Sequence, residues 1–112
     1  MSAIKNDTIV GLLVHPDPEM GAKHWEYSGD LGLVEAMNAA IGADFGVTID
    51  VKMNGEVSCL WISESVGDRE LNIKACIASG QKIYGSFVFL GRKSDGSFCS
   101  LPTETYNFLL GH

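Results

Sequence analysis

The stretch from Val47 to Ser63 begins with seven residues that alternate apolar and polar side chains, and an Asn54-Gly55 pair follows them. In residues 47–53 every second side chain is apolar, which is the period of a β-strand with one buried face. Asn and Gly both tolerate the positive φ angles that a tight type I′ turn needs. The stretch therefore predicts a β-hairpin, and the rest of the chain must supply the elements that cover its apolar face.

A two-residue turn sets the register of this hairpin, with Met53 opposite Glu56 and each further pair one step outward. The second strand is then apolar on both faces, because the face opposite its core side carries Val57, Cys59 and Trp61. Three explanations fit this pattern: another element of the chain covers the face, a bulge shifts the register, or the face is a contact surface. The third explanation predicts self-association, as a homodimer, through Val57, Cys59 and Trp61.

The length of 112 residues and a hydrophobic content of 46% predict a single domain, residues 1–112, with a core of ordinary size. No apolar run approaches the roughly 20 residues that a membrane-spanning helix requires. The first ten residues lack the basic and then apolar layout of a signal peptide, so we expect a cytoplasmic protein. The odd count of 3 cysteines without a C-x-x-C motif predicts free thiols.

The charge of the chain is unevenly distributed. Residues 1–51 carry 8 acidic and 2 basic side chains, whereas residues 52–112 carry 6 of each, so the net charge of −6 lies in the first half. This pattern disfavours nucleic acids and anionic membranes as partners, since both are bound through clustered Lys and Arg. It favours a basic protein partner or a small cationic ligand.

Hydrophobic periodicity and Gly or Pro punctuation predict the remaining elements. In chain order these are a strand at 8–15, a loop at 16–29, a helix at 30–41, strands at 71–78, 83–91 and 98–99, and a terminal helix after Pro102. This order predicts an α+β fold: an antiparallel sheet of about five strands with one main helix and a short C-terminal helix packed on one face.

The helix at 30–41 is expected to be capped by Ser28 or Asp30 and to end at Gly42. Its apolar stripe should pack on the hairpin face that carries Val47, Ile49 and Val51, which leaves Glu35 and Asn38 facing outward.

The expected loop at 16–29 is the richest stretch in chemistry. Its candidate ligand-binding residues are Asp17, His24, Trp25, Glu26 and Tyr27. The carboxylates suit a cation, and the aromatic rings offer stacking and cation–π contact. His15 and Glu19 extend the set of groups that bind metals, but their spacing matches no metal motif. We therefore predict no metal site, no cofactor and no catalytic residue.

These observations predict a small acidic binding protein rather than an enzyme. We expect a non-enzymatic protein-binding module of the inhibitor, immunity-protein or adaptor kind, by analogy of size and charge. The alternative is a small-molecule binding protein, or a minor enzyme, that uses residues 15–27 to hold a small cationic ligand.

Overall fold

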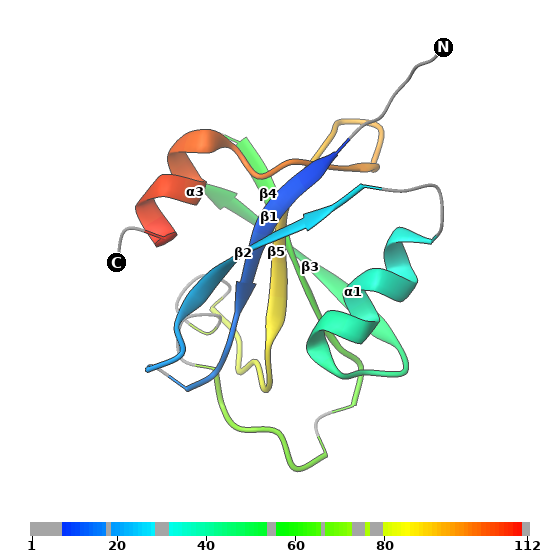
Figure 1. The fold of residues 1–112 in the computed structure, drawn as a ribbon, viewed down its shortest axis with the longest axis vertical. Coiled ribbons are helices and arrows are strands. Elements are labelled where there is room, and N and C mark those ends of the chain that lie inside the picture. The colour runs from blue at the N-terminus through cyan, green and yellow to red at the C-terminus, as the bar shows by residue number, and fades with distance from the viewer. Residues whose placement is uncertain are drawn as a thin grey trace.

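The computed structural model describes residues 8–17, 19–28, 32–53, 56–65, 67–72, 76 and 80–110. Within these residues, strands form one antiparallel sheet that is flanked by helices (Figure 1). The elements are β1 (Ile9–Val14), β2 (Ala22–Tyr27), α1 (Leu33–Ile41), β3 (Gly46–Met53), β4 (Glu56–Ser63), β5 (Phe87–Arg92), β6 (Phe98–Cys99) and α3 (Thr103–Leu110). The predicted α+β class, with a main helix and a short C-terminal helix, is confirmed.

The strands lie side by side in the order β2-β1-β5-β4-β3, and β6 pairs with the end of β5. The predicted strand at 83–91 begins at Phe87, and its apolar residues on both faces fit the central position of β5. Phe87 and Phe89 are buried on one face of β5, and Val88 and Leu90 are buried on the other. The strands β2 and β3 form the two ends of the sheet.

The predicted hairpin has the predicted register. Met53 pairs with Glu56, and the pairing continues without a break to Gly46 and Ser63. Residues 54 and 55, the expected turn, lie outside the described residues. The unbroken ladder shows that no bulge relieves the apolar second face of β4, so another element must cover it.

Two hydrophobic layers lie on opposite faces of the sheet. One contains Leu12, Val14, Val51, Leu60, Ile83, Phe87, Phe89 and Leu101. Tyr106 from α3 packs against this layer, whereas Met37 and Ile41 from α1 belong to the other layer, with Cys59 and Trp61 of β4. Figure 1 shows α1 and α3 on opposite sides of the sheet. The prediction that both helices pack on one face, with α1 over Val51, is therefore wrong in this detail.

The helix α1 begins later than predicted. Gly32 occupies its N-cap position without a side-chain cap, so Ser28 does not cap it, and Asp30 lies outside the described residues. Gly42 ends the helix in the left-handed conformation (φ 68°), as predicted. Asn38 does not face outward, because its side chain reaches the indole of Trp61.

Two segments differ from their predicted structure. The expected loop at 16–29 contains strand β2, which pairs along its whole length with β1. The expected strand at 71–78 is not a strand where it is described: Leu71 makes one isolated bridge, and Cys76 N–H donates to the Asn72 carbonyl at 3.0 Å, a helical spacing. Residues 73–75 and 77–79 lie outside the described residues.

The C-terminal segment completes β1. Since β5 pairs only with residues 12–14 of β1, the backbone of Val10 is free to bond elsewhere. The Val10 N–H donates to Ser100 Oγ at 2.9 Å, and the Leu101 N–H donates to the Val10 carbonyl at 2.8 Å. Among the described helices, none is long and apolar enough to cross a membrane.

Candidate functional site

The five predicted ligand-binding residues all lie on the β1–β2 hairpin, but they do not converge. Because side chains alternate along a strand, β2 separates them onto two faces. His24 lies opposite Leu12, on the face covered by α3, whereas Trp25 lies opposite Gly11, on the face covered by α1. Trp25 and Tyr27 share the α1 face, whereas His24 and Glu26 share the other, so the five residues do not form one site.

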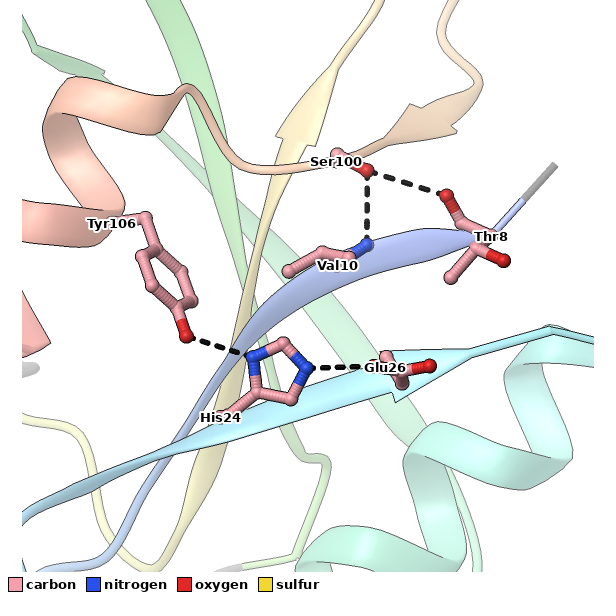
Figure 2. Close-up of polar contacts among 6 residues, drawn as sticks. All are labelled: Thr8, Val10, His24, Glu26, Ser100 and Tyr106. Carbon is pink, nitrogen blue, oxygen red and sulfur yellow. Dashed lines mark hydrogen bonds and ion pairs between the residues drawn. The ribbon is translucent and has the colours of Figure 1, made fainter.

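His24 is the centre of a polar cluster on the α3 face. Its Nε2 lies 2.7 Å from Glu26 Oε1, and its Nδ1 lies 2.7 Å from the Tyr106 hydroxyl. Figure 2 shows the imidazole between these two groups. The His24 and Tyr106 rings meet edge to face, with centroids 5.8 Å apart. The carboxylate and the hydroxyl thus orient the imidazole from both sides.

The hydrogen-bond roles in this cluster depend on the charge of the imidazole. In the neutral form, His24 Nε2–H donates to Glu26 and the Tyr106 hydroxyl donates to Nδ1. In the protonated form, both nitrogens donate, and the Tyr106 oxygen accepts. The side chains of His24 and Glu26 are 48% and 53% exposed, so the cluster is open to water and to a ligand. It can therefore bind a polar group or exchange a proton with one.

The contribution of Tyr106 was not predicted. It comes from α3, 82 residues after His24 in the sequence. The available signal was weak: the alternation of His24, Trp25, Glu26 and Tyr27 indicates a strand, and a strand would place His24 and Glu26 on one face. Nothing in the sequence places α3 over that face.

Trp25 has a packing role. It lies against the apolar layer beneath α1, together with Ile9, Leu13 and Leu33. Its cross-strand neighbour Gly11 has no side chain, so the indole can cover β1. Trp25 is thus a part of the core rim.

Asp17 shapes the turn between β1 and β2. Its carboxylate accepts the Glu19 N–H at 3.0 Å, and its carbonyl accepts the N–H groups of Met20 and Gly21. The ring of His15 accepts the Asp17 N–H at 3.0 Å. His15, Asp17 and Glu19 therefore stabilise the turn, and in the described part of the chain no three His, Cys, Asp or Glu residues are placed to hold a metal ion.

The predicted interface residues have different environments. Cys59 is fully buried and Trp61 is 7% exposed, because α1 covers both of them. The Trp61 ring also meets Phe98 edge to face at 6.1 Å. Val57, which lies near the start of β4, is 39% exposed. The chain itself thus covers most of the face that a partner was expected to cover, and only Val57 remains accessible.

Val57 borders a hollow of about 620 Å³ between the end of the β3–β4 hairpin and the β5–β6 turn. Two acids and two bases line it: Asp50, Glu56, Arg92 and Lys93. The Arg92 guanidinium lies 5.1 Å from the centre of the Phe98 ring and 3.6 Å from Asp50 Oδ1. The acids and bases balance, so this hollow has no preference for one sign of charge.

A scan against protein-family models and searches of curated proteins and of solved structures found no match for this chain. Function is therefore inferred from the chain's own residues.

Proposed function

We propose that this protein is a non-enzymatic binding module that holds an extended, basic segment of a partner protein along β2. The observation that carries this proposal is the position of β2 at the end of the sheet. In the described part of the chain, β1 is its only strand neighbour. An end strand presents a row of backbone N–H and C=O groups to which another chain can add a strand.

The side chains of β2 and its turn support a basic partner. Glu19 and Glu26 are exposed near opposite ends of the strand. Trp25 and Tyr27 are half-buried on the α1 side, where their rings can contact Lys or Arg side chains. The excess of acids in residues 1–51 attracts a basic chain and orients its approach. Backbone bonds would then supply affinity, and alternate side chains would supply specificity.

A short peptide that alternates Lys and Val is a direct probe, with a peptide that alternates Glu and Val as its control. We expect the Lys peptide alone to bind, and we expect it to slow hydrogen exchange at the alternate amides of β2 that point away from β1. Protection confined to other strands, or equal binding of both peptides, would contradict strand addition at β2.

A double charge reversal tests the role of the acids. Glu19→Lys with Glu26→Lys removes two surface attractions and adds two repulsions, so the Lys peptide should bind about tenfold more weakly. Glu64→Lys with Glu70→Lys is the matched control, because it changes the net charge equally at exposed sites outside β2. Equal weakening in both variants would mean that only net charge matters.

A second candidate function rests on the His24 cluster. The exposed Glu26 carboxylate beside His24 and Tyr106 can bind a small cationic compound. Alternatively, the His24 imidazole, oriented by both neighbours, can transfer a proton in a minor enzyme. Thermal melting with a panel of small cations tests this function, since a ligand at a hundred times its dissociation constant adds about 2.7 kcal/mol of stability. Tyr106→Phe should abolish the stabilisation, whereas Tyr84→Phe should preserve it.

A further inference from the structure

The other end of the sheet is formed by β3, a longer strand of 8 residues. It pairs with β4 from Gly46 to Met53, and within the described residues it has no strand on its other side. An uncovered end strand of this length is a template for another strand, and proteins commonly protect such strands with charged side chains. The charges on β3 therefore decide which strand it can accept.

The exposed charges of β3 are Asp50 and Lys52, which are two positions apart. Side chains two apart lie on the same face of a strand. If two copies of β3 pair antiparallel around Val51, Asp50 of each copy lies directly opposite Lys52 of the other. Centring the pair on Asp50 would instead place two Asp side chains in contact, and centring it on Lys52 would place two Lys side chains in contact. Only the Val51 register matches both charges.

We propose that two copies of this protein associate by antiparallel pairing of β3 with β3, centred on Val51. The arrangement is a symmetric dimer in which residues 49–53 of the two copies pair and join two sheets into one continuous sheet. Opposite charges across neighbouring strands stabilise such a pair, and like charges destabilise it. The pairing occurs twice because of the symmetry.

A neighbouring residue supports this assembly. Arg92 lies 3.6 Å from Asp50 on the same face, which places Asp50 between its own Arg92 and Lys52 of the second copy. This surface is separate from β2, so dimerisation does not compete with the proposed binding of a basic segment.

A charge swap tests the register. We expect the unmodified protein to sediment as a dimer at tens of micromolar. Asp50→Lys alone and Lys52→Asp alone each place like charges opposite one another twice, so the dimer should weaken about tenfold to a hundredfold. The double variant D50K/K52D restores both opposite pairs and should restore the dimer. Glu64→Lys and Lys82→Asp are the matched controls for net charge, and both should remain dimers.

Each outcome decides the proposal. A monomer at tens of micromolar for the unmodified protein would overturn it. Single variants that remain dimeric would place the contact elsewhere, and a double variant that is folded by circular dichroism but still monomeric would reject the Val51 register. Loss of Lys-peptide binding without loss of the dimer would reject the proposed function alone.

Discussion

The indole of Trp61 donates a hydrogen bond of 2.9 Å from Nε1 to Oδ1 of Asn38. This bond joins the middle of α1 to the centre of β4. It satisfies the polar atom of a side chain that is otherwise buried among Met37, Val88 and Leu90. The bond also helps to hold α1 over the face of β4 that carries Cys59 and Trp61, a face that would otherwise be exposed.

Loss of this bond should destabilise the protein. Asn38→Ala leaves the Trp61 N–H without its partner in a largely buried position, which should lower the free energy of unfolding by about 1–2 kcal/mol. Urea denaturation followed by tryptophan fluorescence measures the change. Val34→Ala is the control on the same helix: Val34 is exposed, so its loss should change stability by less than about 0.5 kcal/mol. Equal effects of the two variants would contradict the role of the bond.

Gly11 should tolerate substitution worse than Gly42. A Cβ atom at Gly11 would lie 2.3 Å from the Phe89 carbonyl oxygen, and this backbone atom belongs to the central strand. Gly11→Ala should therefore cost about 3 kcal/mol through overpacking. At Gly42 nothing lies within 4 Å, and Ala meets only the strain of a φ of 68°, about 1 kcal/mol. Urea midpoints in the reverse order would show that β1 can move away from β5.

Asp95 provides a pH-dependent contact in the β5–β6 turn. The Ser97 hydroxyl donates to its Oδ1 at 2.6 Å and the Ser97 N–H donates at 2.9 Å, and these bonds lower the pKa of the carboxyl group. The stabilisation is present above the ordinary pKa of Asp and is lost as the pH falls through the lowered one. Ser97→Ala removes the larger contribution, so an NMR titration should show the midpoint of Asp95 moving upward. Ser94→Ala, in the same turn, should leave that midpoint unchanged.

Cys59 should be the least reactive of the three thiols. Burial raises its pKa, and the neighbouring Arg92 offsets only part of this increase. In the native protein, a thiol reagent should label Cys76 and Cys99 before Cys59, and mass spectrometry of the digested protein identifies the order. The stabilisation from the neutral Cys59 thiol is complete below the ordinary pKa of Cys and is lost as the pH rises through the raised one. The free energy of unfolding of Cys59→Ala should therefore fall less at alkaline pH than that of the unmodified protein.

The hairpin was predictable because its information is local. The alternation from Val47 and the turn pair determine both the strands and their register, and the left-handed Gly42 determines the end of α1. The face that α1 covers was not predictable in the same way. Both faces of β4 are apolar, so the periodicity of α1 fits either one, and the bond between Asn38 and Trp61 is a tertiary contact.

Of the His24 cluster, the sequence indicated His24 and Glu26 as candidate residues, but neither their place on a strand nor the contribution of Tyr106. The segment Ala22–Tyr27 contains Lys23, His24 and Glu26 and shows no clear apolar face. Two prolines and Gly21 precede it, so the segment resembled a loop. An end strand needs only one partner and little apolar surface, which weakens its signal. The prediction for residues 71–78 was wrong in the opposite sense. Their alternating pattern indicated a strand, whereas Cys76 has helical hydrogen bonding.

The bonds from Val10 to Ser100 and Leu101 join the first strand to a segment 90 residues later. Strand β5, which pairs with β1 on the side away from β2, is also synthesised late, because it spans Phe87–Arg92. During synthesis, β1 and β2 can therefore form only an isolated hairpin until β5 emerges, and such a hairpin is marginally stable in water. The protein should complete its fold only when nearly the whole chain has left the ribosome, and nascent chains that stop before Phe87 should remain sensitive to protease.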